Sequence, residues 1–453
     1  MLVFLVAGFF SCSQKSQEQP MKPRLLVLTD IGGDPDDQQS MIRLCLYSNE
    51  FDIEGLIASA SGTPGELDEA IVQPQLIKEI IRGYGAVRPN LLLHHEGYPE
   101  AEYLLSMVKS GNPNRGLSYI GEGHDTEGSQ WIIQVADKPD NRRLNISIWG
   151  GQTDLFQALW KVKNTRSEHS YRQFISRLRI YDIADQDGIF DEQYPQHRGL
   201  FYILNQAAKG EDKRNAAFRG MYLGGDESLT SQQWIETHVS QNHGPLGALY
   251  PLETWTAPNP HGVMKEGDTP SWFYFLSMGL SNPDHPGWGG WGGRFKAREN
   301  HFIDAEDQVE EVPSARATVW RWRPRFQHDF QARLDWCVKP RQEANHRPEA
   351  VINGDRGKAI IETKALAGQK VWLNARGSSD PDGNNLSYLW YIYPEPGTYR
   401  RRVSISETGS QNSALSIPED AVKGQTIHVI LEVSDDGSPN LCSYRRMVIT
   451  IDQ

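Results

Sequence analysis

The stretch of the sequence with the clearest chemical potential is residues 28–40, LTDIGGDPDDQQS. Asp30, Asp34, Asp36 and Asp37 fall within eight residues of one another there. Carboxylates packed so closely repel one another and do not all ionise without a nearby cation. Aspartate is also favoured at a helix N-cap and in its first turn, which would account for some of the four but not for all. The cluster therefore predicts a site for a hard, oxygen-ligated cation such as Ca²⁺.

The elements that must position this cluster are a strand before it and a helix after it. Residues 24–31 form an apolar run that ends in polar residues, which is typical of a buried parallel strand. Strand and helix patterns alternate from there for about 160 residues, which predicts an α/β fold with a parallel sheet and a ligand site at the carboxyl ends of its strands. The predicted strands are 24–31, 52–60, 91–94, 144–149 and 178–183, and the predicted helices are 36–48, 67–82, 129–136 and 154–162.

The pattern changes to a period of two near the C-terminus, after a linker-like segment at 345–350. Short strands separated by Gly, Pro, Asp and Asn turns predict an Ig-like β-sandwich. Residues 377–390 (GSSDPDGNNLSYLW) resemble the Ig-like PKD modules of exported bacterial proteins. The expected strands are 370–373, 386–393, 402–406, 427–434 and 446–451, and the expected division of the chain is 1–21 as signal and tether, 22–340 as the α/β domain and 341–453 as the sandwich.

The N-terminus carries the features of an export signal. Residues 2–10 are apolar, and Ser11-Cys12-Ser13 follows them. A short apolar segment of this kind is typical of a secretory signal. Its end resembles a bacterial lipoprotein signal, which implies lipidation of Cys12 and attachment to the cell envelope, at the periplasm or the outer-membrane surface. The alternative is a signal that is simply cleaved. No apolar run reaches the roughly 18–20 residues of a membrane span, so membrane contact is expected only through the lipid anchor.

The amino-acid composition indicates which kinds of binding partner the protein has. The net charge is −12 and no strongly basic stretch exists, which argues against a nucleic-acid partner. The 13 Trp and 17 Tyr residues form an aromatic load that suits either core packing or stacking on sugar rings. Four cysteines in 453 residues exclude a disulfide-dense scaffold.

Residues 29–37 (TDIGGDPDD) resemble the N-terminal fingerprint of the inosine/uridine-preferring nucleoside hydrolases, roughly D-T-D-x-G-x-D-D, with two residues more. More closely, nearly the whole chain after the signal resembles a group of exported bacterial proteins that join a nucleoside-hydrolase-like domain to an Ig-like C-terminal module. That group is labelled cellulose-binding or of unknown function. The resemblance implies a mostly parallel sheet flanked by helices, and homo-oligomers, which nucleoside hydrolases commonly form unless a fused domain blocks them.

The resemblance assigns roles within the aspartate cluster. Asp30 and Asp37 match the family's calcium ligands, and Asp36 matches its general base. Asp34 lies in the two-residue insertion, where it could replace or supplement Asp36 as the catalytic carboxylate.

Two further segments resemble parts of the family's calcium site. Residues 148–155 (IWGGQTDL) are similar to its G-P-L-T-N-L turn, which implies that the carbonyl of Thr153 reaches the metal. Residues 266–268 (EGD) are similar to the segment with the last calcium-binding aspartate, which makes Asp268 the candidate. The family commonly has His before that aspartate, where it helps the departing base, but Gly267 stands there in this chain.

The sequence offers several candidates for contact with a substrate. Glu266, Glu227 and His261 are candidate acids for the leaving group, and His261 or His243 could replace the family's histidine or be merely structural. Asp185, Gln186 and Asp187 lie where the family holds ribose hydroxyls, although its asparagine-rich segment has no clean counterpart, so ribose specificity is not implied. Trp288 and Trp291, in the glycine-rich GWGGWGGR, either stack on a sugar or pack a loop against the second domain.

Three functions follow from these observations. The first is an exported, calcium-dependent glycoside hydrolase that cleaves an N- or O-glycosidic bond of a small carbohydrate or glycoside, with metal-activated water and an aspartate base. The second is a non-catalytic protein that binds a cellulose-like polysaccharide on the same scaffold. The third is a nucleoside hydrolase.

Overall fold

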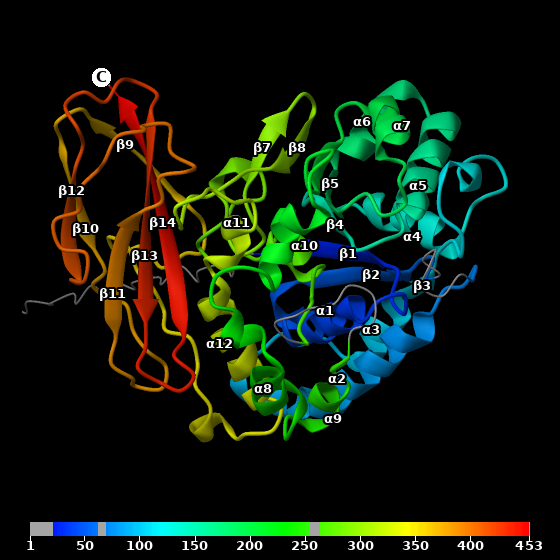
Figure 1. The fold of residues 1–453 in the computed structure, drawn as a ribbon, viewed down its shortest axis with the longest axis horizontal. Helices are drawn as coiled ribbons and strands as arrows, with labels where there is room; N and C mark the ends of the chain where they lie inside the picture. The colour runs from blue at the N-terminus through cyan, green and yellow to red at the C-terminus, as the bar shows by residue number, and fades with distance from the viewer. Residues whose placement is uncertain (1–20, 62–68, 254–262, 453) are drawn as a thin grey trace, which may run out of the picture.

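The computed structural model describes residues 21–61, 69–253 and 263–452. A large α/β unit and a smaller β unit lie side by side (Figure 1). The predicted lipidation site Cys12 and the candidate residue His261 lie outside the described residues. Among the helices within the described ranges, none is both long and apolar enough to span a bilayer.

The α/β unit is built on an eight-stranded sheet with the order β3-β2-β1-β4-β5-β6-β8-β7. All neighbouring strands are parallel except β7 and β8, which form an antiparallel hairpin at one edge. This confirms the predicted mostly parallel sheet. The strands are β1 Arg24–Thr29, β2 Asp52–Ala58, β3 Val108–Ser110, β4 Leu144–Ile148, β5 Leu178–Ile183, β6 Phe201–Asn205, β7 Phe295–Arg298 and β8 His301–Asp304.

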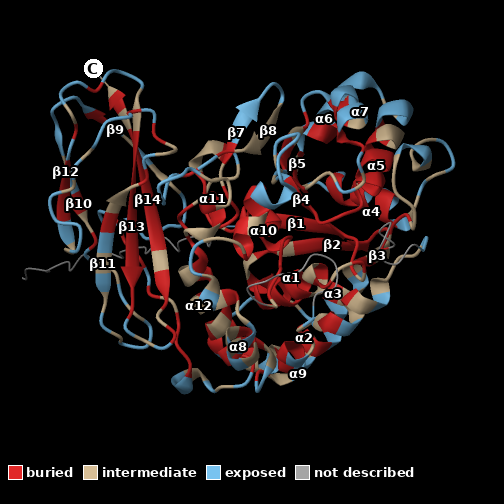
Figure 2. Ribbon diagram, in the orientation of Figure 1, coloured by how far each residue is buried: buried red, intermediate tan, exposed pale blue. Residues whose placement is uncertain are grey.

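The central strand β1 is buried on both faces, which explains its continuous apolar sequence. Leu25 and Val27 belong to one hydrophobic core, and Leu26 and Leu28 belong to the other. The alternation follows from the period of two along a strand. Figure 2 shows the sheet as a buried layer between helices. The carboxyl end of β1 is therefore held at a fixed place inside the molecule.

Helices cover both faces of the sheet and contribute to the two cores. On one face lie α1 Pro35–Leu46, α2 Pro74–His94, α3 Ala101–Met107, α10 Thr269–Phe273 and α12 Arg323–Asp335, and on the other lie α4 Glu127–Ala136, α5 Gln152–Thr165, α6 Glu168–Ser176 and α7 Phe190–Gln193. The short helices α8 Gln232–Ile235, α9 Gly244–Ala248 and α11 Ala317–Trp320 lie in the long connection between β6 and the C-terminal unit.

Two predicted elements of this unit are wrong. The strand predicted at 91–94 is the last turn of α2, because Leu91 and His94 are buried while Leu92 and Leu93 are exposed, a helical spacing. The helix predicted at 67–82 begins only at Pro74 and runs on to His94. The edge strand is instead the three-residue β3, which is too short to leave a pattern in the sequence.

The C-terminal unit holds a four-stranded sheet, β11-β13-β14-β9, and a two-stranded sheet, β10-β12, around their own core. Most pairs are antiparallel, and β14 and β9 are parallel. The strand predicted at 402–406 makes only one bridge, between Ile405 and Leu415. The strands are β9 Ile361–Leu366, β10 Lys370–Asn374, β11 Ser387–Ile392, β12 Asn412–Ser416, β13 Thr426–Ser434 and β14 Cys442–Asp452.

The two units share a buried interface. Ile430 and Tyr444, on strands β13 and β14, belong to the hydrophobic core of the α/β unit. The buried guanidinium of Arg446 donates to the carbonyls of Leu280 at 2.7 Å and of Trp288 at 2.7 Å. An interface that shares core residues and buried hydrogen bonds holds the two units in one arrangement.

Candidate functional site

A cavity of about 610 Å³ opens beyond the carboxyl ends of β1, β5 and β6. This is the position where parallel sheets bind ligands. Both signs of charge line it. The clustered aspartates are Asp30, Asp34, Asp36, Asp37 and Asp268, and the cations are Arg115, Lys209, Lys213, Arg219 and Lys265.

The local sequence explains how the aspartates reach one point. After β1 the chain turns, with the amide of Gly33 donating to the carbonyl of Asp30 at 3.1 Å. Asp34 is the N-cap residue of α1, and Asp36 and Asp37 follow in its first turn. The Thr29 hydroxyl donates to the carboxylate of Asp37 and so ties the helix start to the strand end. These aspartates therefore lie at a helix start and also gather at one point.

Three of these carboxylates form a group that fits a metal ion. Ligand atoms of Asp36, Asp37 and Asp268 lie within 4.8 Å of one another. Asp37 and Asp268 are each only 2 % exposed, and neither makes an ion pair with a described residue. The buried Oδ2 of Asp268 has no hydrogen-bond partner among the described residues. A buried carboxylate oxygen without a partner is costly, and a hard cation would satisfy it.

Arg115 and Lys265 do not balance the carboxylates of the cluster. Burial raises the pKa of Asp37 well above its usual value, and the charges of Asp268 and Asp30 add to the shift. Burial likewise raises the pKa of Asp268, with Asp36 and Asp30 contributing. For Asp30, burial raises the pKa to about 7 even though Arg115 lowers it, with 3.6 Å between Nη2 and the carboxylate Oδ2. Carboxylates that bind calcium must be ionised, so a bound cation would reverse these shifts.

Asp34 forms an ion pair with a buried lysine, Lys265. Burial opposes the charge of Lys265, but Asp36 and Asp34 raise its pKa, so the ammonium stays charged inside the cavity. The carboxylate in the insertion thus serves first to hold this lysine.

Two of the three residues predicted to contact a sugar after β5 line the cavity, and the third does not. Asp185 and Gln186 line the cavity. Asp185 also accepts hydrogen bonds from the amides of Ile189 and Phe190, at 3.0 and 3.1 Å, which fixes its carboxylate at the start of α7. Contact of Asp185 and Gln186 with a sugar stays a prediction.

Asp187 and Thr153 hold each other away from the cavity lining. The Asp187 Oδ2 accepts from the amide of Thr153 at 2.7 Å and from its hydroxyl at 2.6 Å. Thr153 is fully buried in the first turn of α5. The expected metal contact of its backbone carbonyl stays a prediction. Gly150, just before this helix, lies against Asp30, because a Cβ there would come 2.6 Å from the Asp30 Cγ.

The prediction that Glu266 contacts substrate is wrong. Its side chain is 0 % exposed and does not line the cavity. Arg43 donates to it at 3.0 Å and the Tyr250 hydroxyl at 2.6 Å. These buried partners make Glu266 part of the scaffold that presents Asp268, two residues later.

The two tryptophans of the glycine-rich segment are packing residues. Trp291 is 1 % exposed, with its ring 5.3 Å from Phe273 and 6.4 Å from Tyr444. Trp288 stacks on His285 at 4.1 Å and meets the ring of His428 on β13 at 5.4 Å. Neither ring lines the aspartate cavity. Sugar stacking is wrong for the buried Trp291 and stays a prediction for the partly exposed Trp288.

Several cavity residues were not predicted. Phe218, which follows β6, lines the cavity beside Gly267. A Cβ at Gly267 would lie 3.2 Å from the Phe218 ring and 3.3 Å from the Asp36 Oδ2. A side chain at position 267 would therefore require these neighbours to shift by a few tenths of an ångström. Lys265, next to the predicted segment 266–268, was the one missed residue that the sequence could have indicated.

Two family models match the chain. Residues 24–295 match the model described as "Cellulose-binding Sde182, nucleoside hydrolase-like domain". Residues 370–451 match "Cellulose-binding protein Sde0182, C-terminal domain". The chain belongs to the Sde182 family. This confirms the resemblance that its sequence indicated.

The solved structures include a full-length relative of this Sde182 family chain. It is titled "nucleoside hydrolase-related hypothetical protein from Saccharophagus degradans that is associated with carbohydrate metabolism". The match has 34 % identity and a TM-score of 0.80, and covers 95 % of this chain and 100 % of that one. No curated protein matches.

Two further structural matches are too weak to carry an argument. The PKD domain from the KIAA 1837 protein is 18 % identical, covers 23 % of this chain and 88 % of its own, and has a TM-score of 0.17. An endo-fucoidan hydrolase of glycoside hydrolase family 107 is 10 % identical, covers 95 % of this chain and 80 % of its own, and has a TM-score of 0.20. The Sde182 family assignment thus rests on the matches above.

Proposed function

We propose that this Sde182 family chain is a calcium-dependent glycoside hydrolase acting on an N- or O-glycosidic bond of a carbohydrate or glycoside. The observation that carries the proposal is the meeting of Asp36, Asp37 and Asp268 at the cavity, with the Asp268 Oδ2 buried and unpartnered among the described residues. A sugar-binding protein needs no such concentration of unpaired negative charge. A metal-dependent hydrolase needs both a metal site and a base there.

The roles divide by burial. Asp37, Asp268 and Asp30 are buried and would hold the ion, with the carbonyl of Thr153 as a further candidate. When bound, calcium supplies a Lewis acid that lowers the pKa of water. Asp36 is only partly buried at the cavity and would take the proton from the water that attacks the anomeric carbon. The surrounding carboxylates favour the positive charge that develops on the sugar ring.

The place of action is a proposal that rests on the signal-like residues 2–13. We place the protein outside the cytoplasm, tethered through lipidated Cys12, with a carbohydrate as its partner. Asp185 and Gln186 follow strand β5 and line the same cavity as the aspartates. We propose that they hold sugar hydroxyls. Export would give such an enzyme access to carbohydrate outside the cell.

A second function is favoured by one specific feature. Lys265 places a permanent ammonium among the carboxylates and pairs with Asp34. That internal cation could take the place of a metal in a protein that binds carbohydrate without cleaving it. The cellulose-binding description of the Sde182 family agrees with this second function.

One experiment separates the two functions. The full chain is screened with calcium and with EDTA against aryl glycosides, nucleosides and plant-polysaccharide oligomers, beside Asp36→Asn and the distant surface variant Asp137→Asn. We expect calcium-dependent release of reducing sugar that Asp36→Asn abolishes and Asp137→Asn retains. Oligomer binding without release in any condition would instead establish the binding protein.

A further inference from the structure

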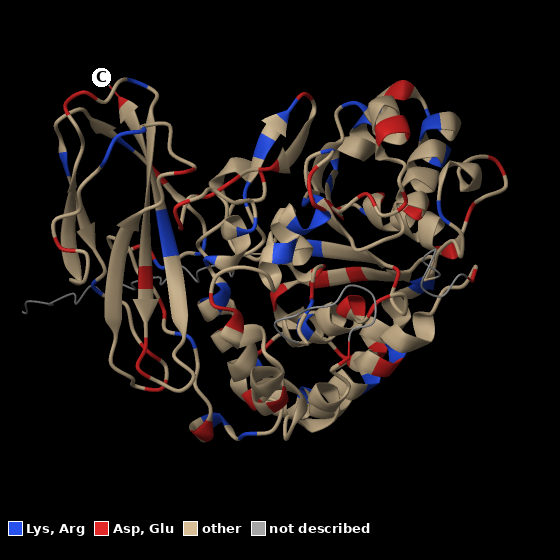
Figure 3. Ribbon diagram, in the orientation of Figure 1, with Lys and Arg blue, Asp and Glu red and all other residues tan. Residues whose placement is uncertain are grey.

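A second cavity, of about 390 Å³, lies between the α/β unit and the C-terminal unit. It shares no lining residue with the aspartate cavity. Six cations line it, against the two acids Glu50 and Glu349, in a chain whose net charge is −12. Figure 3 shows basic residues on β14 where that strand faces the α/β unit. The six cations are Arg333, Arg341, Arg347, Arg356, Lys358 and Arg445.

Acidic partners offset these cations only in part. Arg333 and Lys358 share Glu50, at 2.9 and 3.6 Å, and Arg356 pairs with Glu349 at 2.5 Å. Just outside the lining, Asp329 pairs with Arg333 and Arg347, and Asp355 pairs with Arg445. Arg341 donates to a carbonyl, that of His94. Four carboxylates thus face six cations, which leaves the cavity positive.

Two buried histidines of this cavity, His94 and His346, do not change that balance. Burial lowers the pKa of His94 and of His346, so both rings are neutral near pH 7. Asp382 lies 2.9 Å from the Nδ1 of His346, and the other nitrogen of that ring lies 3.0 Å from His94. Asp382 is therefore engaged by a ring at the edge of the cavity rather than by one of the six cations.

The strongest sign of a ligand is Arg445. Its side chain is 2 % exposed, yet Nε and Nη1 have no hydrogen-bond partner among the described residues. Only Nη2 is engaged, by Asp355 at 2.6 Å. The Nη2 of Arg347, in the same cavity, is likewise buried without a partner among them. Buried donors of this kind cost free energy until an acceptor reaches them.

We propose that the interdomain cavity binds a small oxyanion, either the carboxylate of an acidic sugar or a free sulfate or phosphate. The free Nε and Nη1 of Arg445 lie on different edges of the guanidinium, so each would donate one charge-assisted hydrogen bond to an anion in the cavity. Lys358 lies at the exposed side of the cavity. Its ammonium adds positive charge but does not fix the orientation of the anion. A volume of about 390 Å³ falls within the range of small-molecule pockets.

The ligand would join the two units. Arg333 belongs to α12 of the α/β unit, whereas Arg445 belongs to β14. Binding to a site formed by both should raise the melting temperature, because the anion binds only the docked arrangement. The site is independent of the proposed calcium chemistry, so it should persist in EDTA and in Asp36→Asn.

The test is calorimetric titration of the full chain in EDTA with glucuronate, sulfate and phosphate, and with glucose as the neutral control. The variants are Arg445→Gln and Lys358→Ala, with Arg401→Ala, an exposed arginine elsewhere on the C-terminal unit, as the matched control. We expect at least one anion to bind and glucose not to bind. Arg445→Gln should weaken binding by about 10-fold or more, since it removes a charged donor.

The possible outcomes distinguish an acidic sugar from an inorganic anion, and some of them would contradict the proposed site. Binding of glucuronate alone identifies an acidic sugar, and binding of sulfate or phosphate identifies a free inorganic ion. If Arg445→Gln does not fold, a weaker affinity in Lys358→Ala, whose side chain is 52 % exposed, supports the site. Failure of all three anions to bind, or binding by the cavity variants equal to that of Arg401→Ala, would overturn the proposal.

Discussion

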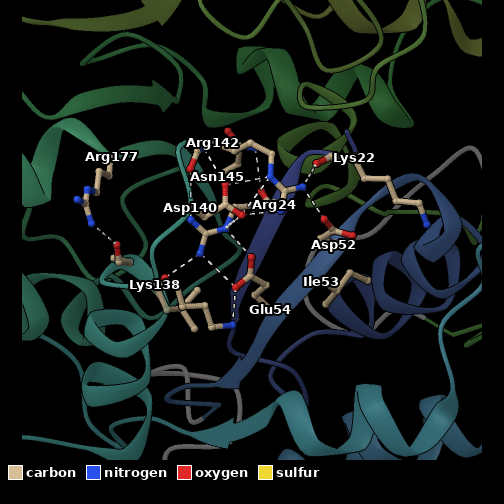
Figure 4. A network of polar contacts seen from close by, with 12 residues as sticks. Lys22, Arg24, Asp52, Ile53, Glu54, Lys138, Asp140, Arg142, Asn145 and Arg177 are labelled. Carbon is tan, nitrogen blue, oxygen red and sulfur yellow. Dashed lines mark hydrogen bonds and ion pairs between the residues drawn. The ribbon is translucent and has the colours of Figure 1, made fainter. Parts of the chain in front are cut away.

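Buried charged side chains are balanced at one end of strand β1 and unbalanced at the other. At the amino end, buried Arg24 pairs with Glu54 at 2.5 Å, and Lys138 reaches the same carboxylate at 2.6 Å (Figure 4). Arg142 binds Asp140 at 2.6 Å and Asp52 at 2.5 Å beside them. Three cations meet three acids there. At the carboxyl end, the buried Asp37 and Asp268 make no ion pair with a described residue.

The pKa shifts have opposite directions at the two ends. Burial opposes ionisation of Glu54, but its hydrogen bonds to Arg24 and Lys138 outweigh that cost and its pKa is lowered. The hydrogen bond from Arg142 lowers the pKa of Asp140 to about 2. At the other end burial raises the pKa of Asp30 to about 7. The balanced charges at the amino end of β1 stabilise the fold. The unbalanced carboxylates at the carboxyl end would be stabilised by a bound ligand.

The largest effect is expected from Asp36→Asn at the unbalanced end. The amide keeps the shape and one oxygen but cannot accept a proton, so turnover should fall by about 10²- to 10⁴-fold while calcium still binds. Initial rates on the substrate found in the screen, together with calcium calorimetry, measure both. Full activity in Asp36→Asn would remove Asp36 as the base and make Asp34 the next residue to test.

Breaking the balanced end should affect stability instead. Arg24→Met leaves the buried Glu54 with Lys138 alone, and removing one partner of a buried pair costs about 3–5 kcal/mol. Denaturant unfolding measures this free energy, and Arg172→Met, in an exposed pair on α6, is the control. Calcium affinity should stay as in the wild type. A coupled loss of calcium binding would mean that the two ends are not independent.

Calcium itself should stabilise the protein through the carboxyl end only. At a calcium concentration about 100 times the dissociation constant, the gain in unfolding free energy is about 2.7 kcal/mol. Thermal melts with calcium and with EDTA measure it. Calcium should raise the unfolding free energy of Arg24→Met by the same amount as that of the wild type, and should not raise that of Asp268→Ala. A gain retained in Asp268→Ala would place the ion elsewhere.

The smallest effect is the response of the amino end to acid. Because the folded pKa values of Glu54 and Asp140 are lowered, their stabilisation is complete above the ordinary carboxylate range near 4 and is lost as pH falls toward 2. Unfolding free energies measured between pH 5 and pH 2.5 should show this loss, and Asp140→Asn should show less of it. An equal slope in both proteins would contradict the assigned pairing.

The parts of this account that the sequence predicted are the local ones. The apolar run of β1, the start of α1 and the four aspartates lie within one short segment, so the pattern alone placed them together. Asp268 came from a family resemblance, and the structure places it beside Asp36 and Asp37.

Contacts between distant segments could not be predicted in this way. Nothing in the local sequence indicated that Arg115 would reach Asp30, or that Phe218 would fill the space beside Gly267. Trp291 shows the reverse problem, because a tryptophan among glycines has the same pattern whether it faces a sugar or a neighbouring domain. The partners that decide such cases come from chain segments far away in the sequence.

The most direct test of the central claim is calcium titration by calorimetry on the full chain, beside Asp37→Ala, Asp268→Ala and the surface control Asp137→Asn. The account predicts tight binding of calcium by the wild type and by Asp137→Asn, and its loss in both cluster variants. Absence of calcium binding in the wild type would contradict it. The carboxylates would then be balanced by Lys265 and Arg115, and the cavity would be a carbohydrate-binding site without metal chemistry.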